Sequence, residues 1–118
     1  MSAASAKYCQ RGEALDFTNA SGSTIGANTV VVTGDRIGVA DRDIPDGELA
    51  VLHVSGVFKI DKSSSNVIAM GKTVYYDGTG ITEAADDGGS PATPYPRAGY
   101  AAAPADSSDT AILVKING

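Results

Sequence analysis

The sequence has little of what catalytic centres and nucleic-acid-binding surfaces are usually built from. Among 118 residues there is one histidine, and nine lysines and arginines stand against fourteen aspartates and glutamates. The single imidazole, His53, argues against a histidine metal cluster and against a Ser-His-Asp triad. The formal charge of −5 argues against nucleic acid, because affinity for phosphates depends on clustered basic side chains. We therefore predict a protein that is not an enzyme, needs no cofactor and has no nucleic-acid partner.

Cysteine and long apolar runs are also scarce. Cys9 is the only cysteine, so no intramolecular disulfide can form. The N-terminus lacks the apolar segment of a secretory signal peptide. No apolar run approaches the roughly 20 residues that a membrane-spanning helix needs. These absences predict a soluble protein that is made in a reducing cytoplasm and has no membrane partner.

Aromatic side chains are few. The chain has five tyrosines, two phenylalanines and no tryptophan, but fourteen glycines. A chain of this length fits one domain and buries roughly two thirds of the surface that the unfolded chain exposes. The core is therefore predicted to be thin and made of valine, isoleucine and leucine. Association with copies of itself or with a larger partner would compensate for a small core.

What the sequence does contain is a series of short β-type runs separated by Gly, Asp and Pro. Runs of β-branched and apolar residues of strand length, bounded by turn formers, predict strands. The predicted strands lie within residues 30–32, 37–39, 49–54, 57–60, 70–76, 81–82, 98–103 and 110–116. The fold class is therefore mainly β, either a small single-domain β-barrel or a β-tulip-like sandwich with a flexible N-terminal arm.

Two neighbouring strands differ in their predicted burial. Residues 49–54 are apolar on both faces apart from His53, which predicts a strand that is buried on both sides. In residues 57–61 apolar and polar side chains alternate, which predicts one buried face and one wetter face. Gly56 between them indicates a bulge or a sharp bend.

The remaining segments define the predicted organisation of the chain. Residues 1–10 form a flexible N-terminal arm, because the first six have nothing to bury. A first strand lies within residues 7–18, and residues 11–118 form a single β-rich domain. A loop at residues 86–96 holds three of the five prolines, so no central strand runs through it.

Two short motifs resemble known active-site loops but are incomplete. Gly71-Lys72-Thr73 matches the end of a phosphate-binding P-loop, yet the glycine required five positions earlier is Asn66, and no helix pattern follows. Asp77-Gly78-Thr79-Gly80 is similar to the aspartic-protease loop, but Gly78 interrupts the Asp-Thr-Gly sequence. A tight hairpin turn explains this second motif better.

Three other candidate residues have interpretations that are simpler than a catalytic or modified site. His53 sits in an apolar strand, which favours a packed or interface histidine over a catalytic one. Cys9 lacks a basic cluster that would activate its thiol. Asn19-Ala20-Ser21 is a glycosylation sequon by pattern, but without a secretory signal it carries no weight.

An acidic cluster lies between two predicted strands. Calcium prefers several oxygen ligands at loop spacing, but this spacing matches no EF-hand. Arg36 and Arg42 lie among the carboxylates, so a solvated, salt-bridged loop is the simpler interpretation. The acidic residues are Asp41, Asp43, Asp46 and Glu48.

A succession of sequence blocks along nearly the whole chain resembles the small capsid cement, or head decoration, proteins of tailed bacteriophages. No single block is diagnostic, and the specificity comes from their order and from the closing Lys-Ile-Asn-Gly. Residues 1–6 and the loop at 86–96 depart from the resemblance. The blocks are Lys7-Tyr8-Cys9-Gln10-Arg11-Gly12, Leu15-Asp16-Phe17-Thr18, Gly34-Asp35-Arg36-Ile37-Gly38-Val39-Ala40, Ile44-Pro45-Asp46-Gly47-Glu48-Leu49, Val54-Ser55-Gly56-Val57-Phe58, Met70-Gly71-Lys72-Thr73-Val74-Tyr75-Tyr76-Asp77, Ala98-Gly99-Tyr100-Ala101 and Val114-Lys115-Ile116-Asn117-Gly118.

The resemblance implies a structural virion protein without catalytic activity. Such a protein would bind the exterior of the expanded phage head and stabilise it against the pressure of packaged DNA. Its partners would be the major capsid protein and copies of itself, with a trimer favoured over a dimer. It would be located on the outer surface of the capsid, and in the host cytoplasm during assembly.

The arm is the predicted attachment device. A segment that is unstructured when free can pair as an added strand with an exposed edge of the major capsid protein. The capsid-binding residues are predicted to be Ser2, Ala3, Ala4, Ser5, Ala6, Lys7, Tyr8, Cys9 and Gln10.

The alternative hypothesis is a β-barrel adaptor or a carbohydrate-binding module displayed on the virion. Sugar platforms need exposed aromatic rings, and Tyr95 in the proline-rich loop is predicted to be the most exposed of them. The other candidate rings are Tyr75, Tyr76 and Tyr100.

Overall fold

Turn-forming residues divide the chain into short strands, as the spacing of Gly, Asp and Pro predicts. A computed structural model describes residues 3–118, and within that range no helix forms. The strands are β1 Ala14–Thr18, β2 Val30–Thr33, β3 Arg36–Ala40, β4 Leu49–His53, β5 Val57–Asp61, β6 Thr73–Tyr76, β7 Ile81–Thr82, β8 Arg97–Ala101 and β9 Ala111–Ile116. The predicted mainly β fold is confirmed.

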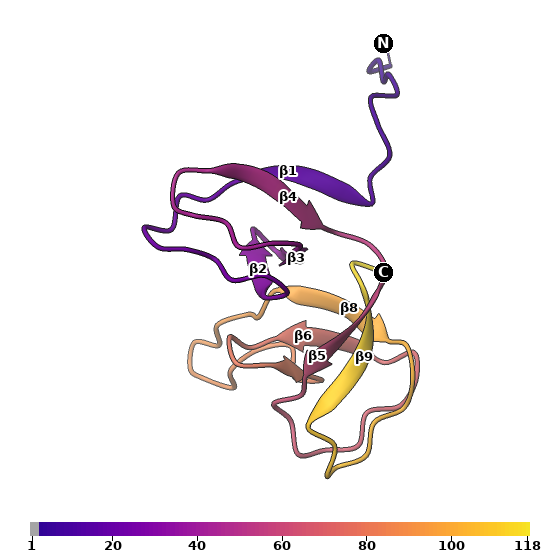
Figure 1. The fold of residues 1–118 in the computed structure, drawn as a ribbon. Coiled ribbons are helices and arrows are strands. Elements are labelled where there is room, and N and C mark those ends of the chain that lie inside the picture. The colour runs from indigo at the N-terminus through magenta and orange to yellow at the C-terminus, as the bar shows by residue number, and fades with distance from the viewer. Residues whose placement is uncertain (1–2) are drawn as a thin grey trace.

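The strands form two antiparallel sheets, which lie one above the other in Figure 1. Sheet 1 has the order β1-β4-β3-β2, and sheet 2 has the order β5-β9-β8-β6-β7. The chain passes from sheet 1 to sheet 2 between β4 and β5. Gly56 lies in this connection with a φ of 117°, which confirms the predicted bend.

Two strands occupy only the later part of the ranges predicted for them. The first strand starts at Ala14, because residues 3–10 pair with nothing. β6 starts at Thr73, because Gly71 takes a φ of 87° in a turn where Lys72 N donates to Ala69 O at 3.1 Å. A left-handed φ is compatible with glycine in a turn but not with a continuing strand.

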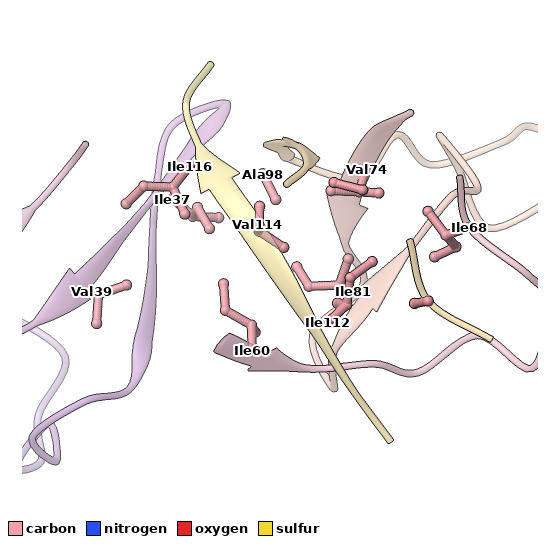
Figure 2. Close-up of a cluster of buried hydrophobic side chains, with 12 residues drawn as sticks. Ile37, Val39, Ile60, Ile68, Val74, Ile81, Ala98, Ile112, Val114 and Ile116 are labelled. Carbon is pink, nitrogen blue, oxygen red and sulfur yellow. The ribbon is translucent and has the colours of Figure 1, made fainter. Parts of the chain in front are cut away.

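The main core lies between the sheets and inside sheet 2. Its fully buried members include Ile37 of β3 and Val114 and Ile116 of β9, which Figure 2 shows close together. Each buried isoleucine or valine stabilises the fold by about 1.5–3 kcal/mol relative to an exposed one. A second, smaller cluster lies on the other face of sheet 1 and consists of Ala40, Ile44, Ala50 and Leu52.

The prediction that β4 is buried on both faces is wrong. Ala50 and Leu52 are buried on one face, but Leu49 is 59% exposed, and Val51 and His53 are only half-buried on the other. The physical reason is the extent of sheet 2. Its core residues reach β3 and the edge of β2, whereas β4 and β1 extend beyond it.

The end of the chain holds the two sheets together. Asn117 Nδ2 donates to the carbonyls of Ile37 and Val54 on the sheet 1 side, at 2.8 and 2.9 Å. Its backbone N–H donates to Ala98 O of sheet 2 at 2.8 Å. Nearby, Arg97 N donates to Asp35 O at 3.1 Å. The residues that close the sequence therefore form polar contacts across the sheet interface.

Candidate functional site

The predicted capsid-binding arm lies outside the folded body. Ser2 falls outside the described residues, but Ala3 to Gln10 are all exposed and in no strand. Figure 1 shows them leaving the body beyond β1. Tyr8 is 85% exposed, and the hydrogen bond from Cys9 Sγ stays local, to Lys7 O at 3.7 Å. The arm thus offers its backbone and one aromatic ring to a partner.

The strand that follows the arm also has a free edge. β1 pairs with β4 on one side and lies at the end of sheet 1. The backbone N–H and C=O groups on an edge are available to another strand. The arm and this edge form one accessible stretch of chain, from residue 3 to the end of β1.

The acidic cluster serves to join two loops. Asp43 Oδ1 accepts a hydrogen bond from Ala27 N at 2.8 Å, and Asp46 Oδ1 accepts one from Gly22 N at 3.0 Å. Glu48 forms an ion pair with Arg42 at 3.0 Å. Within residues 3–118 no group of three or more His, Cys, Asp or Glu is placed to hold a metal ion. The salt-bridged loop is the correct interpretation for Arg42, while Arg36 lies in the neighbouring hairpin.

The sequon asparagine is a structural residue. Asn19 is fully buried, and its Nδ2 donates to Ser23 O at 2.7 Å and to Ile44 O at 2.8 Å. Its Oδ1 accepts from the backbone N–H and the hydroxyl of Ser21 at 2.9 and 2.7 Å. All the hydrogen-bonding capacity of the amide is used, so the side chain anchors the loops that cover the smaller core. Sequence reasoning missed this role, because an Asn-x-Ser turn also fits an exposed loop.

The two incomplete motifs are both turns. Gly71 and Lys72 lie in the turn before β6 and not at the start of a helix. Asp77 to Gly80 connect β6 to β7, with Asp77 N donating to Gly80 O at 3.1 Å, so the predicted hairpin is confirmed. Neither geometry supports phosphate binding or acid proteolysis.

Three carboxylates in the sheet 2 half have lowered pKa values. Burial alone would raise the pKa of Asp77, but hydrogen bonds from Ser63, Thr79 and Gly80 outweigh it and hold the pKa below its ordinary 3.8. The pKa of Glu83 is lowered in the same way. Burial opposes ionisation, but hydrogen bonds from Asn66 and Ser64 lower its pKa below 4.5, with help from the nearby Lys62 charge.

The third carboxylate organises the proline-rich loop. Backbone N–H groups of Thr93 and Gly89 donate to Asp87 Oδ1 at 3.0 and 2.8 Å and lower the pKa of Asp87. Asp87 N also donates to Thr93 O, and Tyr95 N donates to Ala85 O at 2.9 Å. The loop at 86–96 carries no regular strand, as predicted, but it is folded back on itself.

The tyrosines do not form a sugar platform. Tyr95, predicted to be the most exposed ring, is half-buried, as are Tyr75 and Tyr76. Tyr100 is 38% exposed, and the most exposed ring is Tyr8 on the arm. The prediction for Tyr95 is wrong, since the loop is folded back on itself and Tyr95 N donates to Ala85 O at its start.

A groove of about 490 Å³ lies where the sheets meet. One wall comes from β2 and β3, with Val30 and Val39, and the other from β5, with Phe58 and Ile60. His53 lies beside it, with its ring centroid 6.0 Å from that of Phe58. Its lining is mixed, because Lys59, Asp61 and Tyr76 also line it beside these apolar side chains.

Comparison with known families decides what kind of protein this is. A family model described as phage cement protein matches residues 9–116, which is most of the chain. The chain belongs to the phage cement protein family. No curated protein and no solved structure matches it.

Membership assigns this cement protein a structural role at the phage capsid and an association with the virion, and it implies a role without catalysis. Within residues 3–118 no helix has the length and apolarity to cross a membrane. Most of the arm precedes the matched range, so the family model describes chiefly the body of the cement protein.

The structure gives physical reasons for blocks that carried the resemblance. Gly99 has a φ of 142°, and a Cβ there would lie 2.0 Å from Lys115 O. Only glycine therefore lets β8 approach β9 this closely. Asn117 is the residue that joins the sheets. Gly99 and Asn117 contact residues that are distant in the sequence. The sequence blocks could therefore be recognised, but the physical reason for these two residues could not be deduced from them.

Proposed function

We propose that this cement protein binds the exterior of the expanded phage head and stabilises it against the pressure of packaged DNA. The observation that supports this is the combination of family membership with an arm whose described residues, 3–10, are all exposed and lie in no strand. Residues 1–10 serve as the arm, and residues 11–118 form the single domain that it attaches. The partner is the major capsid protein on the outer surface of the head.

Attachment occurs by strand addition. Among the arm's described residues, 3–10, Tyr8 is the one large apolar side chain, so the affinity comes mainly from main-chain hydrogen bonds to an exposed edge of the capsid protein. Copies of the protein assemble into a closed oligomer, with a trimer favoured over a dimer. Several arms on one oligomer multiply modest contacts by factors on the order of 10² to 10⁴ through effective concentration.

The mode of stabilisation follows from mass action. A protein that binds the mature lattice and not its precursor stabilises that lattice by about 2.7 kcal/mol per site at 100 times the dissociation constant. Assembly takes place in the host cytoplasm, and the protein remains on the virion surface. Neither nucleic acid nor membrane takes part.

Sedimentation with purified heads tests this proposal. The full chain should bind expanded, undecorated heads saturably and unexpanded heads not at all, and a shortened chain beginning at Arg11 should lose at least 100-fold in affinity. A matched pair of full-length variants tests the mode of attachment. Ala4→Pro with Ala6→Pro removes two N–H donors and should weaken binding, whereas Ala4→Ser with Ala6→Ser should not.

Two results would contradict the proposal. Failure of the full chain to bind either form of head removes the capsid-exterior function. Full occupancy by the shortened chain removes the arm as the attachment device and transfers that role to the body.

A further inference from the structure

One face of sheet 1 is only partly covered within a single copy and exposes apolar side chains beside polar ones. In the β1–β4 register, Thr18 lies opposite Leu49 and Asp16 opposite Val51, so these four side chains project from the same face. Leu49 is 59% exposed and Val51 half-buried. A strand that is apolar on both faces is normally covered on both. We call this surface, completed by His53, the β4 face.

The β4 face continues into the groove between the sheets. His53 lies opposite Val39 in the β3–β4 register, and its ring packs 6.0 Å from Phe58. Val39 and Phe58 both line the groove. The β4 face therefore borders the groove, although Val39 itself is buried and Phe58 packs partly against the main core.

A second uncovered apolar face lies on the outside of sheet 2. Val57 is 56% exposed, Leu113 42% and Tyr100 38%. Lysines alternate with them, because Val57 and Tyr100 both lie opposite Lys115, and Leu113 lies opposite Lys59. We call these five residues the β9 face. It is a patch of apolar side chains with two cations among them, and the exposed Asp61 lies at its end, two residues after Lys59 in β5.

The two faces have complementary charge. From residue 13 to residue 54, which covers sheet 1 and its loops, there are seven carboxylates and two arginines. The β4 face carries Asp16, whereas the β9 face carries two lysines. Complementary charge on otherwise apolar surfaces favours association and fixes its orientation.

We propose that the β4 face of one copy packs on the β9 face of the next. The occupant is a second copy of this chain, because the chain itself supplies both the apolar areas and the opposite charges. A contact between two different faces is heterologous, and it closes into a ring when the rotation between copies allows. This inference rests on the oligomer in the proposed function and assigns its surfaces.

Analytical ultracentrifugation of the full chain over micromolar to millimolar concentrations, without heads, provides the test. Lys59→Glu with Lys115→Glu breaks the β9 face, and Asp16→Lys with Leu49→Lys breaks the β4 face. Each double variant should be monomeric, with association at least tenfold weaker than that of the natural chain. Mixed in equal amounts they should form a one-to-one dimer, because each still offers one intact face to the other.

Arg36→Glu is the matched control. Arg36 is exposed and lies on the same face of β3 as Gly38 and Ala40, away from the β4 face, so reversing its charge should leave association unchanged. Circular dichroism and thermal unfolding establish that each variant is folded.

Three outcomes would overturn the inference. They are a natural chain that stays monomeric throughout, double variants that associate like the natural chain, and a mixture that gives no dimer. Normal association combined with lost head binding in the Lys59→Glu, Lys115→Glu variant would assign the β9 face to the capsid instead. Because association is measured without heads, it is independent of whether the capsid proposal holds.

Discussion

The two sheets are stabilised in different ways. Sheet 2 contributes most of the main core, with three buried residues from β9 alone, and its strands pack through apolar side chains. Sheet 1 has a second cluster of only four buried residues, covered by loops that are held by Asn19, Asp43 and Asp46. The sheet 2 half therefore depends on close packing, and the sheet 1 half depends on side-chain hydrogen bonds to its loops, buried at Asn19 and exposed at Asp43 and Asp46.

The largest effect is expected where β8 approaches β9. Gly99→Ala would place a Cβ 2.0 Å from Lys115 O, which belongs to the backbone and cannot move aside cheaply. Overpacking and the unfavourable φ should together lower the free energy of unfolding by at least about 3 kcal/mol. Urea unfolding measures this change in the free energy of unfolding. Gly12→Ala is the control, because a Cβ there meets nothing within 4 Å, and its effect should stay within about 0.5 kcal/mol.

A smaller and local effect is expected in sheet 1. Asn19→Ala leaves the carbonyl of Ile44 without its side-chain donor and the Ser21 N–H without its acceptor, which should cost about 1–3 kcal/mol. Hydrogen exchange should show the loops at 19–28 and 41–48 opening while β8 and β9 stay protected. Equal loss of protection in both sheets would contradict the conclusion that Asn19 stabilises the sheet 1 half alone. Ser65→Ala, at an exposed loop position, provides a control.

The smallest effect is expected from acid, and it belongs to the sheet 2 half. The lowered pKa values of Asp77, Glu83 and Asp87 mean that their ionised forms are favoured by folding. Their contribution is complete above the unfolded pKa values, which lie near 3.8 for aspartate and 4.5 for glutamate, and it is lost as pH falls through the lower folded values.

Thermal unfolding between pH 6 and pH 2.5 measures this loss. The midpoint should fall mainly below pH 4, and Asp77→Asn should flatten part of that fall. An unchanged midpoint down to pH 2.5 would show that these hydrogen bonds do not favour the ionised carboxylates.

The sequence predicts the strands well, because their turns are local. Gly34-Asp35, Asp77 to Gly80 and Gly56 lie at the hairpins and the bend that their residue types predict. The arm is recognisable because its residues are mostly small or polar and form no strand pattern. Burial of β4 was not predictable in the same way. It depends on how far sheet 2 extends across sheet 1.

Long-range anchors were likewise hidden in the sequence. Asn117 bonds to Ile37 and Val54, and Asn19 bonds to Ile44, across separations that no local pattern encodes. The same limit applies to the surfaces of the candidate site. Alternation shows that residues 57–61 have an exposed side, but only the register places Val57 and Tyr100 on either side of Lys115.

The position of β9 sets the order in which the chain can fold during synthesis. β9 is the last strand in sequence but lies inside sheet 2, between β5 and β8. When β5 emerges from the ribosome it has no hydrogen-bonded neighbour in its own sheet, whereas every strand of sheet 1 is already present. Sheet 1 can therefore form early, but its hydrogen bonds to Asn117 form only after that residue has been made. The two halves should therefore stay open to each other until β9 and Asn117 are made, which delays close packing of the main core.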